Sequence, residues 1–133
     1  MNDVTQPKPT SQSAKPWILY TRVSTDDQAE NGVSLQAQES TGRGYIQMRN
    51  LPLGEVVTDP GQSGKSLNRP GVQRILAMIR QGRIGGVVVW RLDRLTRSLR
   101  DLLDFVALIE KHGVALASVN EQISTDTPVG RLL

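Results

Sequence analysis

The chain has 133 residues, 38% of them hydrophobic, and carries a formal net charge of +3 from 16 basic and 13 acidic residues. This size fits a single domain with a modest core. The absence of cysteine excludes a disulfide framework and a thiolate metal site. No apolar run approaches the length of a membrane span and the polar start is unlike a signal peptide, so we expect a soluble, cytoplasmic protein.

The first predicted elements are a tail, a strand and a helix. Residues 1–15 hold almost nothing to bury, which predicts a disordered tail ahead of a domain over 16–133. The apolar run 17–23 predicts a strand that is buried on both faces. After a polar loop, Ser34 is suited to cap a helix over 35–48, although two glycines inside this helix each cost about 1 kcal/mol relative to alanine.

The middle of the chain repeats this order of strand, loop and helix. Residues 53–58 read as a second strand, and 59–68, rich in glycine, serine and proline, predict a mobile surface loop. Apolar residues at helical spacing predict a helix over 71–80. The run 85–90 is the clearest buried strand of the chain.

The last predicted elements are a helix over 98–112 and a strand over 114–119. Strands that alternate with helices imply right-handed crossovers. The fold class that follows is α/β, with a mostly parallel central sheet of four to five strands flanked by helices.

Polar side chains follow three of the predicted strands. Arg22 and Ser24 end the first strand, Asp59 and Ser63 follow the second, and the arginine-rich run 91–97 follows the third. Residues two apart on a strand point to the same side, so Arg22 and Ser24 are aimed into one space. Sites in such sheets lie outside the carboxyl ends of the strands, so all three clusters are expected to converge on one edge.

The arginines at 91, 94, 97 and 100 allow two interpretations. On a continuous helix they would form a drifting basic stripe, which is most often a solvated face. Directly after a buried strand, however, they lie where a ligand should dock, and their planar forks suit phosphate. We expect Arg94 and Arg97 to be exposed and therefore to contribute little to stability.

Several familiar kinds of site are disfavoured by the residues present. His112, the one histidine, falls at the end of a predicted helix, so a Ser-His-Asp triad is improbable and Ser24 could equally be a turn residue. A nucleotide-binding P-loop would need glycine where Asp59 stands. The aspartates are too scattered to indicate a metal site, and Asp59 and Asp93 are better interpreted as orienting partners for arginines.

Four motifs in order resemble the catalytic domain of serine recombinases, the resolvases, invertases and integrases. They are Tyr20-Thr21-Arg22-Val23-Ser24-Thr25-Asp26-Asp27-Gln28, Val33-Ser34-Leu35-Gln36-Ala37-Gln38, Asp59-Pro60-Gly61-Gln62-Ser63-Gly64 with Asn68-Arg69-Pro70-Gly71, and Leu92-Asp93-Arg94-Leu95-Thr96-Arg97. The spacing from Asp26 to Gln38 looks more like the large integrase branch. The resemblance implies a resolvase-like sheet with flavodoxin-like layering.

The resemblance also implies a mechanism and a set of site residues. Ser24 would attack a DNA phosphodiester and form a 5′-phosphoserine link, without ATP, metal or any other cofactor. The residues that would surround the phosphate are Arg22, Arg94 and Arg97, with Arg69 as a further contact. The residues that would orient these groups or the flanking loop are Gln28, Asp93, Asp59 and Ser63.

In the family a long helix begins near the point where this sequence stops, followed by a DNA-binding region. The resemblance therefore implies DNA as partner, and self-association into dimers and tetramers through segments beyond residue 133. We expect the 133 residues alone to fold but not to recombine DNA. Two other classes stay open, a non-catalytic α/β domain that binds phosphate or a partner, and a phosphatase-like or nucleotide-binding enzyme.

Overall fold

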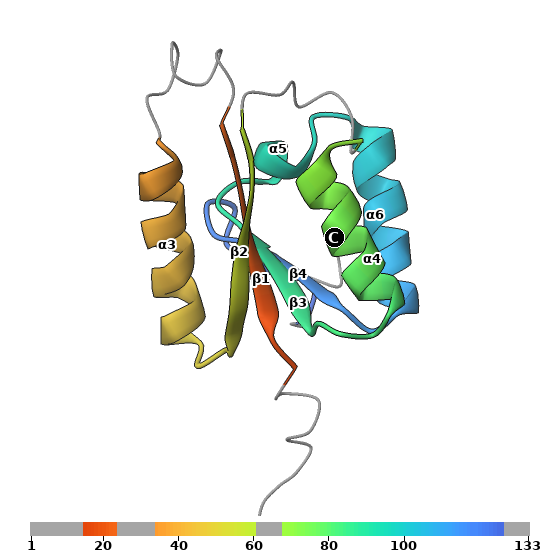
Figure 1. Cartoon of the computed structure of the whole chain (residues 1–133), viewed down its shortest axis with the longest axis horizontal. Helices are drawn as coiled ribbons and strands as arrows, with labels where there is room; N and C mark the ends of the chain where they lie inside the picture. The colour runs from red at the N-terminus through yellow and green to blue at the C-terminus, as the bar shows by residue number, and fades with distance from the viewer. Residues whose placement is uncertain (1–14, 24–33, 61–67, 127–133) are drawn as a thin grey trace, which may run out of the picture.

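The computed structural model describes residues 15–23, 34–60 and 68–126, which form a five-stranded sheet between helices (Figure 1). The strands are β1 (Trp17–Val23), β2 (Leu53–Pro60), β3 (Gly86–Val89), β4 (Ala115–Ser118) and β5 (Ile123–Ser124). The helices are α3 (Leu35–Met48), α4 (Pro70–Arg80), α5 (Leu92–Leu95) and α6 (Leu99–Lys111). Apart from Lys15, the predicted tail lies outside the described residues. None of the described helices is long and apolar enough to cross a membrane.

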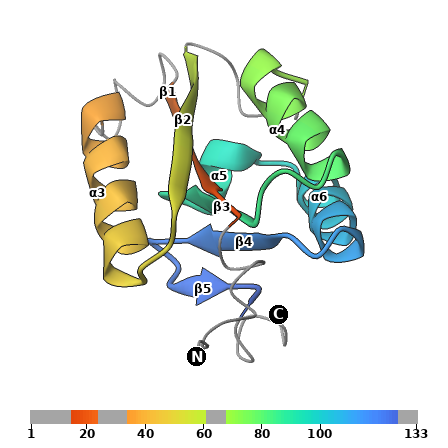
Figure 2. The same ribbon diagram turned by 60° about the horizontal axis from the view of Figure 1, so that its bottom comes forward.

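The sheet confirms the predicted α/β class. Its strand order is β2-β1-β3-β4-β5, with β1 to β4 parallel and β5 antiparallel to β4. Helix α3 covers one face, while α4 and α6 cover the other (Figure 1). The short strand β5 extends the sheet beyond β4, as Figure 2 shows.

The side chains of β1 alternate between two separate cores. Ile18 and Tyr20 pack into the core under α4 and α6, whereas Trp17 and Leu19 pack into the core under α3. Because strand side chains repeat with a period of two, Arg22 falls on the same face as Tyr20. The strand therefore delivers a charged side chain to the end of the larger core.

One strand extends beyond its predicted end, and two short elements were not assigned from the sequence. Strand β2 continues to Pro60, so Asp59 is a buried strand residue and not part of a surface loop. The run after β3 forms the one-turn helix α5, which was not expected as a separate element. Strand β5 makes up the fifth strand of the predicted four to five, but its position was not assigned, since two residues are too few to produce an alternating pattern.

The end of α3 is tied to the segment after β5 by Arg49. Its guanidinium donates to Asp126 at 2.9 Å and to the Tyr45 hydroxyl at 2.7 Å. Burial alone would raise the pKa of Asp126, but the hydrogen bonds from Arg49 and Ser124 outweigh it and hold that pKa below its usual value. This contact fixes β5 at its edge of the sheet.

The two glycines of α3 have different surroundings. Replacing each of them by alanine is therefore predicted to change stability in opposite directions. A Cβ at Gly42 would lie 2.3 Å from Cδ1 of Leu19, whereas a Cβ at Gly44 would have no heavy atom within 4 Å. We expect Gly42→Ala to lower the free energy of unfolding by roughly 1–3 kcal/mol through overpacking. Gly44→Ala should raise it by up to about 1 kcal/mol, because alanine is the better helix former. Urea denaturation of both variants checks this, and a Gly42→Ala protein as stable as wild type would contradict the close packing.

Candidate active site

The candidate site lies at the edge of the sheet where β1 and β2 end. Arg22 and Asp59 stand opposite each other in the register of these two strands, and α5 follows β3 at the same edge (Figure 1). Three of the predicted site residues, Ser24, Gln28 and Ser63, lie outside the described residues. Of the predicted site, the structure therefore describes the arginines and the aspartates.

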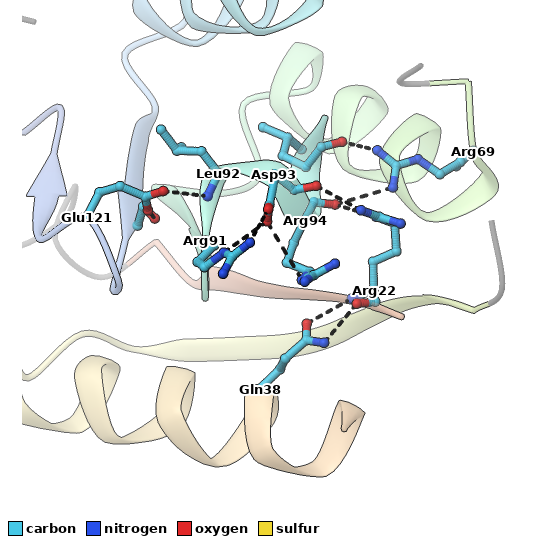
Figure 3. Close-up of polar contacts among 10 residues, drawn as sticks. Arg22, Gln38, Arg69, Arg91, Leu92, Asp93, Arg94 and Glu121 are labelled. Carbon is cyan, nitrogen blue, oxygen red and sulfur yellow. Dashed lines mark hydrogen bonds and ion pairs between the residues drawn. The ribbon is translucent and has the colours of Figure 1, made fainter. Parts of the chain in front are cut away.

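Arg22 is fully buried, and its guanidinium contacts the main chain of α5. Its Nε donates to the carbonyl of Arg94 and its Nη2 to the carbonyl of Asp93, each at 2.8 Å (Figure 3). Carbonyls near the end of a helix lack partners within the helix, and a buried carbonyl needs one. Arg22 supplies these partners and so joins β1 to α5.

Arg69 approaches the same turn from the start of α4. Its Nη1 donates to the carbonyl of Arg94 at 3.3 Å and its Nη2 donates to the carbonyl of Leu95. The guanidinium also lies 5.7 Å from the centre of the Tyr20 ring. Burial lowers the pKa of Arg69, but an arginine stays protonated in a protein. Two buried cations from different elements thus hold one short helix.

Asp59 caps α4 from the neighbouring strand. Its carboxylate accepts hydrogen bonds from the amides of Gly71 at 2.8 Å and Val72 at 3.2 Å, and from the Tyr20 hydroxyl at 2.8 Å. Burial raises the pKa of Tyr20, so this phenol remains a donor. The hydrogen bonds described for Asp59 fix the start of α4, which directly follows Arg69. The predicted role of Asp59, to orient the arginines or the flanking loop, stays a prediction.

The run after β3 gathers two arginines around Asp93. Its carboxylate accepts from Nε of Arg91 at 3.3 Å and lies 3.8 Å from Nε of Arg94 (Figure 3). Both guanidinium carbons also lie close to the centre of the Trp90 ring, 4.8 Å away for Arg91 and 5.2 Å for Arg94. Cation–π contacts of this kind favour a fixed guanidinium. The predicted link between Asp93 and an arginine is therefore present.

The arginines after β3 do not form a basic stripe on the solvent-exposed face of one helix. Only 1% of the surface of Arg94 is exposed, whereas Arg97 is exposed. Helix α5 ends before Thr96 and α6 begins after Ser98, so the arginines of this run do not share one continuous helix. The expectation that Arg94 is exposed is wrong. Arg22 and Arg69, for which no exposure was predicted, are buried as well.

Sequence reasoning missed two residues that shape this edge. Gln38 is fully buried and bonds to the main chain of Arg22, and it lies on the buried stripe of α3 with Gly42 and Ile46. A polar residue at that spacing was a usable signal, because a buried amide needs partners. Glu121 accepts from the amide of Leu92 at 3.5 Å, and no sequence pattern indicated it.

The arrangement suits an anion better than a metal ion. Within the described ranges no group of three or more histidine, cysteine or acidic side chains could hold a metal. Four arginines of the edge face three carboxylates, those of Asp59, Asp93 and Glu121, which leaves a local excess of positive charge. The arginines are Arg22, Arg69, Arg91 and Arg94. Guanidinium groups held in fixed positions can stabilise the charge of a phosphoryl group without reorganising.

Comparison with known proteins confirms the family resemblance. The family described as "Resolvase, N terminal domain" matches residues 17–133. The DNA-invertase of Escherichia phage P1 is 36% identical over 114 residues, which cover 86% of this chain and 54% of the invertase. The transposon Tn552 resolvase of Staphylococcus aureus is 35% identical over 118 residues, which cover 87% and 53%. The chain thus spans about half the length of these curated relatives.

The same likeness holds for the three-dimensional structure. The N-terminal catalytic domain of TP901-1 integrase superimposes with a TM-score of 0.82 and 38% sequence identity, over 89% of this chain and 88% of that one. A resolvase family site-specific recombinase from Streptococcus pneumoniae gives a TM-score of 0.72 at 29% identity, over 88% and 81%. The predicted resolvase-like sheet is therefore confirmed.

Proposed function

Because the chain belongs to the resolvase N-terminal domain family, we propose that it is the catalytic domain of a site-specific serine recombinase. The observation that carries this proposal is the meeting of Arg22, Arg69 and Arg94 at one edge of the sheet. They come from three separate elements, and Ser24 follows Arg22 by two residues in the sequence. A hydroxyl next to several cations suits the attack on a phosphodiester.

In this reaction the Ser24 oxygen forms a bond to phosphorus and the bond from phosphorus to the 3′ oxygen breaks. The proton lost by the serine is balanced by the proton gained on the departing 3′ oxygen. The products are a 5′-phosphoserine link and a free 3′-hydroxyl. The covalent link conserves the energy of the phosphodiester, so the rejoining step is the reverse attack by a 3′-hydroxyl and consumes no ATP.

We assign the arginines to charge stabilisation. Arg22, Arg94 and Arg97 are the proposed contacts of the scissile phosphate, with Arg69 in support. They do not act as the base, because an arginine side chain keeps its proton. The proposed orienting residues are Gln28, Asp59, Ser63 and Asp93.

For the whole protein we propose a DNA-integrating or DNA-inverting recombinase that works in the cytoplasm and is encoded by a bacterium, a phage or another mobile element. The likeness to TP901-1 integrase and the spacing from Asp26 to Gln38 favour the large integrase branch. Strand exchange would require association of several copies through a segment that follows residue 133.

One observation favours a second candidate, a non-catalytic α/β domain that binds phosphate or a partner. Arg22 and Arg69 donate to main-chain carbonyls, which is what purely structural arginines do. In that case the arginine cluster would serve the fold, and Ser24 would be a turn residue. The two candidates differ in a single observable, a covalent bond to DNA.

A chimera tests the proposal. Residues 17–133 replace the matching segment of the phage P1 invertase, and the product is incubated with nicked duplex carrying that invertase's site, in EDTA and without ATP. We expect a protein–DNA adduct that survives SDS. If the parent invertase forms the adduct and the folded chimera does not, the second candidate is favoured and the proposal fails.

A further inference from the structure

Gln38 makes an unusual pair of contacts for a helical side chain. Its Nε2 donates to the carbonyl of Arg22 at 2.8 Å, and the amide of Arg22 donates to its Oε1 at 3.2 Å (Figure 3). None of its surface is exposed. A buried primary amide is unfavourable unless both of its polar atoms are hydrogen-bonded, and here both are.

The sheet explains why Arg22 needs this partner. The carbonyl of Pro16 accepts from Gly85, on the side of β1 that faces β3, and main-chain groups return to the same side every second residue. The main-chain amide and carbonyl of Arg22 therefore also point to the side of β1 that faces β3. However, β3 ends at the partner of Tyr20, two residues earlier, because the chain turns away into α5. The amide of Gln38 takes the place of the missing strand.

Arg22 is consequently held from two directions. Its main chain is bonded to Gln38 on α3, and its guanidinium is bonded to the carbonyls of Asp93 and Arg94 in α5. If the contact with Gln38 is lost, the end of β1 keeps its bond to β2 but loses its anchor on the opposite side. The guanidinium of Arg22 then shifts relative to Arg94.

We propose that Gln38 is a positioning residue for DNA cleavage, which fixes the main chain of Arg22 and through it the guanidinium at the phosphate. This inference rests on the proposed function, since Arg22 bears on cleavage only if the domain cleaves DNA. Gln38 is fully covered and touches no DNA itself. Its loss therefore lowers the rate of the chemical step and leaves the affinity for DNA unchanged.

The first test compares Gln38→Leu with Gln36→Leu in the chimera. Gln36 is exposed on the same helix, so it controls for the loss of one glutamine. At saturating nicked DNA we expect Gln38→Leu to slow adduct formation about 100-fold, the scale of a misplaced reacting group. The DNA concentration for half-maximal binding should not change, and Gln36→Leu should match the unsubstituted chimera. Equal rates for Gln38→Leu and the unsubstituted chimera overturn the inference.

If Gln38→Leu does not fold, a second variant, Gln38→Glu, tests the same role of Gln38. In Gln38→Glu a carboxylate can accept from the amide of Arg22 but cannot donate to its carbonyl, whereas the protonated acid can do both. The rate of this variant relative to the unsubstituted chimera should therefore rise as pH is lowered, once both rates are divided by the folded fraction from circular dichroism. A ratio that is constant with pH overturns the inference.

The same experiment separates the inference from the function on which it rests. If the unsubstituted chimera forms no adduct while the parent invertase does, both the proposed function and the role of Gln38 fail. If the unsubstituted chimera forms the adduct and the Gln38 variants are equally fast at every pH, only the role of Gln38 fails.

Discussion

Ser24→Ala is expected to abolish the SDS-resistant adduct of the chimera, because alanine has no oxygen with which to bond phosphorus. The reaction has no substitute path through the arginines, which can stabilise charge but cannot act as nucleophiles at ordinary pH. Binding of the uncleaved site should persist, since phosphate contacts supply most of the affinity. The measurement is single-turnover adduct formation on nicked DNA, with a gel-shift titration of the same preparation.

Ser34 offers the matched control. Its hydroxyl caps α3 by accepting from the amide of Ala37 at 3.0 Å. Ser34→Ala should therefore lower the free energy of unfolding by about 1 kcal/mol and leave adduct formation intact. An adduct that survives Ser24→Ala, or one that disappears equally in both variants, contradicts the assignment of the nucleophile.

The second large effect is expected for Arg94→Ala and Arg97→Ala, which should both slow DNA cleavage. Each should slow cleavage roughly 100- to 1,000-fold, the effect of removing one charge-stabilising donor from a transition state. Their effects on folding should differ, because Arg94 is buried against Trp90 and Asp93 whereas Arg97 is exposed. We expect Arg94→Ala to lower the free energy of unfolding by roughly 1–3 kcal/mol and Arg97→Ala by less than about 0.5 kcal/mol.

Urea denaturation and adduct kinetics on the same preparations separate these two effects. Rates are compared at a temperature at which both variants remain folded. If Arg97→Ala unfolds the domain, its role is structural. If either variant cleaves as fast as wild type, that arginine has no part in the chemistry.

The main elements of the fold could be predicted because their residues alternate with regular periods. The buried run 86–89 and the apolar spacing of α4 and α6 carry this signal directly. Helix α5 and strand β5 could not be found in this way, since one helical turn or two strand residues hold no complete period. The capping signal at Ser34 was correct, because this serine stands directly before α3 and its side chain caps that helix. Ser98 caps α6 in the same way, although it was predicted only as the first residue of that helix.

The sequence predicted that the site residues meet at this edge of the sheet, but it did not predict which groups contact one another there. Arg22, Asp59 and Arg94 reach one region because parallel strands end together. The burial of Arg22 and Arg69 was not predictable, because their partners are main-chain carbonyls, which every residue possesses. The pattern of side chains therefore does not reveal this pairing. The spacing of the arginines after β3 likewise did not indicate that Arg94 is buried while Arg97 is exposed.

The central claim is that the Ser24 oxygen becomes bonded to a DNA phosphate. The most direct test is to isolate the chimera's adduct, digest it with nuclease and protease, and locate the nucleotide-bearing residue by tandem mass spectrometry. We predict a phosphoryl group on Ser24, with the remaining nucleotide attached through its 5′ oxygen. A phosphoryl group on any other residue, or attachment through a 3′ oxygen, would contradict the account.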